Sequence, residues 1–263
     1  MKIRKLHLIL LALVAIAGLA SCGGSKEPSA LVAQCERLNG EFAAVASDSP
    51  MFVDSVSCAY ADATIGVLVR FSDPTISVQA ISEPLAEWIV SQYLKAHATP
   101  ETADILNTLG KEEGHMDLTF AGSDGSRVSY SFTSSRLKKL LQARNSELNL
   151  AAARTSVNDI LAGRCATYAE AVKALGAEYE FQGGFAQYTL TFKDARMLAN
   201  QTSGTLQGRY RPVLSQQFGE LGACRDFVTD VLRSLGYDGF RFIYAADGSD
   251  KTVKTAIAWR YIQ

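Results

Sequence analysis

The feature that most constrains this fold is a seven-residue motif that occurs twice. Residues 104–110 read DILNTLG and residues 230–236 read DVLRSLG, so four of the seven positions are identical. In both copies apolar residues recur at helical spacing and a glycine follows the last of them, which is typical of a helix that ends at a C′ glycine. The same helix is therefore expected in two places along the chain.

Further matches flank this motif in the same order. The apolar segment at 66–71 resembles the one at 187–192, and a turn containing Asp-Gly follows each copy of the motif. Convergence of common helix and turn chemistry is the alternative, but three matches in one order favour an internal duplication. We therefore expect two tandem α+β repeats, at residues 31–140 and 141–263.

Hydrophobic periodicity predicts the same succession of elements in each half: a helix, a strand hairpin, two helices and a second hairpin. The first helix is expected at 31–46 in one half and at 168–175 in the other. Because the strands alternate apolar and polar residues, each sheet should bury one face. The expected fold class is α+β, with two similar halves that are each an antiparallel sheet of hairpins with helices on one face. The Ala-rich segment 136–161 predicts one or two helices, which would join the halves rigidly.

The beginning of the chain carries an export signal. Three cationic residues precede an apolar run at 7–20, which is shorter than the roughly 20 residues that span a bilayer. The run ends in Leu19-Ala20-Ser21-Cys22. This pattern resembles the lipobox of bacterial lipoprotein precursors, in which small residues precede the cysteine that becomes the lipidated N-terminus. The alternative is an ordinary secretory signal followed by a chance cysteine.

The resemblance implies a signal peptide at residues 1–21 and a lipid anchor on Cys22. In this class the cysteine carries a diacylglyceryl thioether and usually a third acyl chain such as palmitate, and two chains already give stable anchoring. In this class an Asp directly after the cysteine favours the inner membrane. Gly23 stands at that position, so the outer membrane is favoured. Residues 22–30 would be the lipidated cysteine and a polar tether that keeps the body close to the membrane.

The net charge of the chain limits the kinds of partner that it could bind. Removal of residues 1–21 takes away three of the 26 basic residues and none of the 27 acidic ones, so the formal net charge falls from −1 to −4. Nucleic acid is therefore not expected as a partner, because phosphate binding needs a concentrated basic surface. The sequence has no C-x-x-C pair and no EF-hand rhythm, so we expect neither a metal site nor a cofactor.

Four cysteines besides Cys22 are candidates for disulfide bonds: Cys35, Cys58, Cys165 and Cys224. Four cysteines allow three pairings, of which Cys35–Cys58 with Cys165–Cys224 is the most economical, since it places one bridge in each half. Buried free thiols are the alternative.

Few residues point to a binding site. Arg209, Tyr210 and Arg211 place two guanidinium groups around a ring, a cluster that could contact a carboxylate, a sugar or a peptide. A helical face with solvated arginines is the simpler interpretation. Trp88 and Trp259 lie in apolar patterns that predict core positions. The Asp-Gly segments at 122–127 and 247–252 predict hairpin turns rather than cation or phosphate loops.

No catalytic residue is assigned. His97 and His115 are the histidines left after signal removal, and no G-x-S-x-G or H-E-x-x-H motif accompanies them. Glu112 and Glu113 lie at a turn, where solvated charge is the simpler interpretation. The expected function is that of a lipid-anchored cell-envelope lipoprotein with a non-enzymatic binding or scaffold module and a protein or glycan partner. An envelope hydrolase with an unrecognised site and a structural subunit of an envelope assembly are the alternatives.

Overall fold

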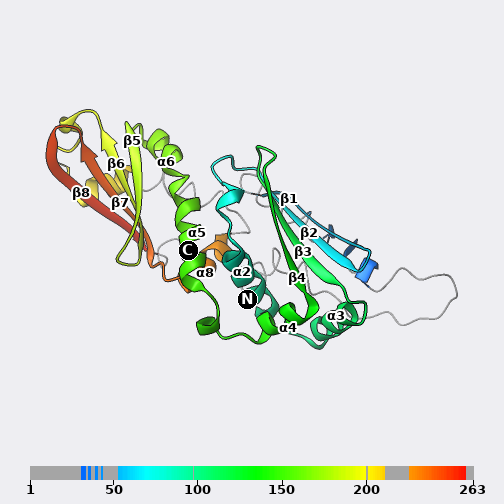
Figure 1. The fold of residues 1–263 in the computed structure, drawn as a ribbon. Helices are drawn as coiled ribbons and strands as arrows, with labels where there is room; N and C mark the ends of the chain where they lie inside the picture. Colours follow the sequence, from blue (N-terminus) through cyan, green and yellow to red (C-terminus); the bar gives the residue numbers. More distant parts are fainter. Residues whose placement is uncertain are drawn as a thin grey trace.

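The computed structural model describes eight stretches of the chain: residues 31–33, 35–36, 39–40, 43, 53–96, 98–199, 201–210 and 225–258. They form two four-stranded sheets, one at each end of an elongated molecule (Figure 1). The first sheet contains β1 (Val53–Ala61), β2 (Thr64–Phe71), β3 (His115–Ala121) and β4 (Arg127–Thr133) in that spatial order. The second contains β5 (Gly176–Gln182), β6 (Phe185–Phe192), β7 (Gly239–Ala246) and β8 (Ser249–Ala258) in the same order.

Helices occupy corresponding places in the two halves. An N-terminal helix, of which residues 31–33, 35–36, 39–40 and 43 are described, precedes the first sheet, and α6 (Cys165–Val172) precedes the second. Between the hairpins the first half has η2 (Val78–Ala80), α2 (Glu83–Ala96) and α3 (Pro100–Lys111). The second half has η4 (Ala195–Met197), a helix at 203–210 and α8 (Arg225–Ser234). The α+β class and the two similar halves are therefore confirmed.

One part of the sheet prediction is wrong. The hairpins β1–β2, β3–β4, β5–β6 and β7–β8 are antiparallel, but the central pairs β2–β3 and β6–β7 are parallel. Neighbouring parallel strands need a long crossover, which is usually helical. The two helices between the hairpins supply that crossover, because they carry the chain back to the end of the sheet at which the preceding strand began.

In both halves, a residue at the end of the crossover donates a backbone hydrogen bond to the turn of the preceding hairpin. The amide of His115 donates to the carbonyl of Ala63 over 3.1 Å, and the amide of Asp238 donates to the carbonyl of Gly184 over 2.6 Å. A Cβ on Gly114 would lie 2.2 Å from the Ala63 oxygen, so the close approach requires glycine there. The repeated contact strengthens the case that one unit was duplicated.

Alternation along the strands buries one face of each sheet. In the first sheet the buried face carries residues such as Val67, Leu118 and Phe132, against which α2 packs its fully buried Trp88. The prediction of a core role for Trp88 is confirmed. In the second sheet the equivalent face is rich in aromatic residues. Its rings are those of Tyr179, Phe181, Tyr188, Phe192, Phe240, Phe242 and Tyr244.

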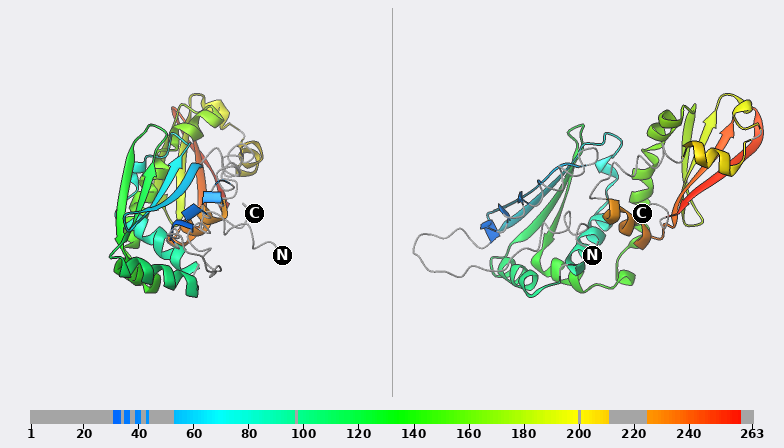
Figure 2. Two further views of the ribbon diagram at one scale, coloured as in Figure 1. Left: turned by 90° about the vertical axis from the view of Figure 1, so that its right-hand side faces the viewer. Right: turned by 180° about the vertical axis from the view of Figure 1, so that it is seen from behind.

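The segment between the halves is helical, as the sequence predicts. It forms α4 (Ser134–Gln142), η3 (Asn145–Glu147) and α5 (Leu150–Ala162). The residue division expected after 140 falls inside α4, which packs on α2 and α3 of the first half. Figure 2 shows α5 between the two sheets, and α5 packs on α2 and on β5. A single hydrophobic cluster therefore runs through both halves.

Among the described residues, none of the helices combines the length and the apolar character that crossing a membrane requires. The apolar run at 7–20, the lipobox and the tether lie outside the described residues.

Candidate functional site

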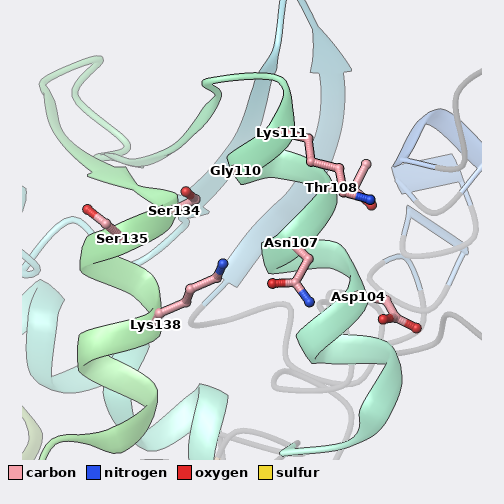
Figure 3. Close-up of a pocket in the computed structure, with 8 residues that line it drawn as sticks. All are labelled: Asp104, Asn107, Thr108, Gly110, Lys111, Ser134, Ser135 and Lys138. Atoms are coloured by element: carbon pink, nitrogen blue, oxygen red, sulfur yellow. The ribbon is translucent and has the colours of Figure 1, made fainter.

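A polar hollow of about 690 Å³ opens between α3 and α4 in the first half (Figure 3). Each of the two helices that form its walls begins at a threonine cap. The Thr99 side chain caps α3 by accepting from the Thr102 amide, and the Thr133 side chain caps α4 by accepting from the Arg136 amide. The lining residues are Asp104, Asn107, Thr108, Gly110, Lys111, Ser134, Ser135 and Lys138.

Gly110 lets the two helices approach at the hollow. A Cβ at this position would lie 3.0 Å from Ser134 Oγ and 3.8 Å from Lys138 Nζ. The expected role of Gly110 as the C′ residue of its helix is wrong, because α3 continues to Lys111 and the left-handed position belongs to Glu113, with φ of 52°. In the second half Gly236 does hold the left-handed position after α8, with φ of 88°.

The position of α4 is fixed by an ion-pair cluster. One Arg136 nitrogen lies 2.7 Å from a Glu83 oxygen and 2.7 Å from a Glu87 oxygen, so α4 is held against α2. Burial alone would lower the pKa of Arg136, but the hydrogen bonds and charges of the two carboxylates raise it overall. The guanidinium also lies 5.2 Å from the centroid of the Phe132 ring.

The hollow offers donors suited to an anionic or hydroxyl-rich ligand. In Figure 3 the Lys138 ammonium points into the space between Ser134 and Asn107, whereas Lys111 and Asp104 extend away from α4. The first turn of α4 contains no acidic side chain, so the positive end of its dipole adds to the potential of Lys138. Sequence reasoning missed this site. Four of its lining residues belong to the 104–110 motif, which predicted only a helix, and they meet the residues of α4 only when α3 and α4 pack together.

A second cluster joins the two halves through α5. On the first-half side, Ser156 Oγ donates to Ser82 Oγ over 2.5 Å. Just beyond α5, the guanidinium of Arg164 pairs with the carboxylate of Asp73, and both side chains are largely buried, at 14% and 13% exposed. Thr75 donates its amide and its hydroxyl to the other Asp73 oxygen, over 2.9 and 2.6 Å.

The charge state of Asp73 follows from these contacts. Burial alone would raise the pKa of this carboxyl group, but the hydrogen bonds from Thr75 and the charge of Arg164 lower it overall. The carboxylate is therefore ionised and fully paired at neutral pH.

On the second-half side, α5 accepts hydrogen bonds from buried tyrosines. Asn158 Oδ1 accepts from the hydroxyls of Tyr179 and Tyr237, over 2.7 and 2.6 Å. The Leu161 carbonyl accepts from the Tyr188 hydroxyl over 2.7 Å. Burial is the main cause that raises the pKa of all three phenols, to about 12 for Tyr237, so they are neutral donors.

Arg154 completes this side of the joint, since its Nε donates to the Leu235 carbonyl over 2.7 Å. In duplicated folds a groove between the two similar halves is the usual place for a ligand. At that place the structure has α5, with packed and hydrogen-bonded side chains on both of its sides.

Two of the three candidate ligand-contact residues, Arg209 and Tyr210, are the last described residues of the helix at 203–210. Tyr210 is buried in the aromatic core of the second half, where its ring stacks 5.4 Å from that of Tyr244. Arg209 is exposed, with its guanidinium 5.3 Å from the Tyr210 ring centroid. Arg211 lies outside the described residues, as does Trp259.

The histidine placements give no catalytic relay among the described residues. His115 Nε2 lies 3.4 Å from Thr64 Oγ1 and 3.5 Å from Asp117 Oδ1, on the exposed face of the first sheet. A nucleophile–His–Asp relay uses the two ring nitrogens for two different partners, whereas here one nitrogen faces both. His97 lies outside the described residues. Glu112 and Glu113 are exposed, and Glu112 accepts from the Tyr60 hydroxyl.

The cysteines of the first half come together. Cys35 and Cys58 are buried, with their sulfur atoms 2.8 Å apart. Cys165 is half-buried at the start of α6, where burial raises the pKa of its thiol, and Cys224 lies outside the described residues.

Within the described part of the chain, no group of three or more His, Cys, Asp and Glu side chains is placed to hold a metal ion. Comparison with known proteins gave no relative: no protein-family model matches the chain, and no curated protein and no solved structure is detectably similar to it.

Proposed function

We propose that this chain is a lipid-anchored lipoprotein of the bacterial cell envelope, whose body is a non-enzymatic binding or scaffold module with a protein or glycan partner. The anchor is Cys22, and the Gly23 that follows it favours the outer membrane. The short tether to residue 30 keeps the body near the membrane surface. The proposed location rests on the lipobox. The proposed mode of action rests on the joint, by which we mean the contacts that α5 and Arg164 make with both halves.

The single observation that carries the mode of action is the double attachment of α5. Asp73 with Arg164 fixes its end to the first half. Asn158 fixes its middle to two tyrosines of the second half, Tyr179 on β5 and Tyr237 just before β7. A hinged pair of lobes would need free side chains at the joint, whereas these are buried and paired. A rigid body presents its surfaces preorganised, so a partner loses less conformational entropy on binding.

The hollow at α3 and α4 is the first place to look for the contact. It combines an ammonium, hydroxyls and an amide, the donors that carboxylate and sugar groups require. A protein side chain or a glycan could therefore supply the ligand group.

The test is cross-linked co-purification of the tagged protein from detergent-solubilised envelopes, with Cys22→Ser as the unanchored control. The proposal expects a partner that is recovered with the anchored protein and lost with the control. A stoichiometric protein would identify an assembly subunit, and a bound glycan would identify a glycan-binding module. Equal recovery of the same proteins with both forms would contradict an anchored mode of action.

Two lysine variants locate the contact. Lys138→Gln removes the ammonium that points into the hollow, while Lys139→Gln removes an exposed neighbour on α4 that does not line it. Binding at the hollow predicts that only the first variant reduces partner recovery, by roughly tenfold for one charge-assisted contact of about 1.5 kcal/mol. Equal recovery with both variants would place the contact elsewhere on the body.

A further inference from the structure

The N-terminal helix meets the edge of the first sheet through a pair of thiols. Cys35 on this helix and Cys58 on β1 are 4% and 3% exposed, and Cys58 Sγ donates to Cys35 Sγ over 2.8 Å. The two residues therefore lie within reach of each other across the contact between two separate elements.

The same helix also holds the backbone of Cys58. β1 is the outermost strand of its sheet, and Cys58 pairs with Val67 on its inner side. On its outer side the Asn39 amide accepts from the Cys58 N–H over 2.6 Å and donates to the Cys58 carbonyl over 2.8 Å. Cys35 and Asn39 are four residues apart and so lie on one face of the helix. Both fix the same point of an edge that would otherwise be open for pairing with another chain.

In the second half, the corresponding helix contacts its sheet through different residues. Tyr179 pairs with Tyr188 on β6 as Cys58 pairs with Val67 on β2. There the helix α6 packs its Tyr168 ring 4.6 Å from the Tyr188 ring, and Tyr179 lies 5.1 Å from the same ring. Edge-to-face and tilted ring contacts therefore hold α6, whereas the first half has two cysteines at the corresponding contact.

We propose that Cys35 and Cys58 form a disulfide that locks the N-terminal helix onto edge strand β1. In the envelope the oxidant would be a disulfide-bearing thiol oxidase. The Cys35 thiolate attacks one sulfur of the oxidase disulfide and displaces its other sulfur as a thiolate, which takes up the proton that Cys35 lost. Cys58 then loses its proton and attacks the Cys35 sulfur of this mixed disulfide, and the second oxidase sulfur leaves and takes up that proton. One disulfide is reduced to two thiols, and two protein thiols are oxidised to one disulfide.

The order of attack follows from the hydrogen bond between the thiols. By accepting from Cys58, Cys35 has a lowered pKa, while the pKa of Cys58 is raised by the same bond and by burial. Thiolate character makes Cys35 the attacking group. The disulfide itself does not depend on the proposed function. If Cys22 is lipidated, the disulfide also connects the membrane tether covalently to the first sheet.

The first test is peptide mass spectrometry of protein purified from envelopes without reductant and alkylated while unfolded. Tryptic peptides 27–37 and 38–70 contain Cys35 and Cys58 respectively. The proposal expects these peptides joined, two hydrogen masses below their sum, and separately alkylated only after reduction. Full alkylation of both cysteines without reductant would overturn it. Cys165→Ser is the matched control and should leave the linkage intact.

The locking role is tested on the same wild-type protein by hydrogen exchange, so no variant has to fold. Reduction should speed amide exchange in residues 53–61 at least tenfold while leaving 176–182, the equivalent strand of the second half, unchanged. Identical exchange of residues 53–61 before and after reduction would refute the lock. Loss of lipidation at Cys22 would leave both results unaltered, so the two proposals can fail separately.

Discussion

Replacing Gly163 with Ala tests the close contact between the halves, because two physical effects predict opposite outcomes. Gly163 follows α5 with helical dihedrals, φ of −58° and ψ of −21°, so an L-residue fits its backbone. Helix propensity alone would then favour Ala by up to about 1 kcal/mol. A Cβ at this position, however, would lie 2.7 Å from the Thr75 carbonyl oxygen, where ordinary contact begins at 3.4 Å.

The first-half loop would therefore have to move by about 0.7 Å, the difference between those two distances. This loop carries Asp73, so the movement also disturbs its pair with Arg164. Overpacking of this kind costs about 1–3 kcal/mol, which outweighs the propensity gain. We expect the free energy of unfolding to fall by about 1–2 kcal/mol and Tm by roughly 2–8 °C for a chain of this size.

The assay is urea and thermal denaturation of the mature chain carrying Cys22→Ser. Gly208→Ala is the matched control, since Gly208 is exposed in the helix at 203–210 and a Cβ there meets nothing within 4 Å. The control should gain about 0.5–1 kcal/mol. A Gly163→Ala protein that is as stable as the control would refute the claim that the halves are in close contact there.

Four further substitutions probe the joint and the crossover by equilibrium unfolding. Because the pKa of Asp73 is lowered in the folded state, its contribution to stability is complete above the ordinary pKa near 3.9 and is lost as pH falls through the folded pKa. The difference in unfolding free energy between Asp73→Asn and wild type should therefore be largest at neutral pH and smallest near pH 3. A difference that does not change with pH would contradict this assignment. Asn158→Ala leaves two buried tyrosine hydroxyls without their acceptor and should lower the free energy of unfolding by about 2–5 kcal/mol. Tyr237→Phe removes a single donor and should lower it by less than about 1.5 kcal/mol. Equal losses would refute the shared acceptor. Gly114→Ala should cost about 3 kcal/mol or more, since its Cβ would lie 2.2 Å from a backbone oxygen, and a neutral effect would refute the crossover contact.

The sequence predicts the elements better than the way in which they pair. Helical periodicity and the repeated motif locate the two crossover helices and both halves, because these signals are local. The parallel pairing of β2 with β3 is not local, since it depends on where the crossover returns the chain. His115 and Asp117 alternate along β3 in the same way whether the neighbouring strand runs parallel or antiparallel.

The candidate sites show the same limit. Gly110 is recognisable as a glycine near a helix end, but its role in the approach of α4 depends on packing between helices far apart in the sequence. Asn158 carries no signal of its own, because its two tyrosine partners come from strands and loops that follow it. That Cys35 and Cys58 lie close together could be predicted, since cysteines are few and one pair within each half is the simplest arrangement.

The most direct test of an anchored envelope lipoprotein is the mass of its N-terminal tryptic peptide after detergent extraction from membranes. We predict a peptide of residues 22–26 with a diacylglyceryl group on Cys22 and an acyl chain on its amino group. A chain that begins at Met1, or an unacylated peptide released from a soluble fraction, would contradict this account.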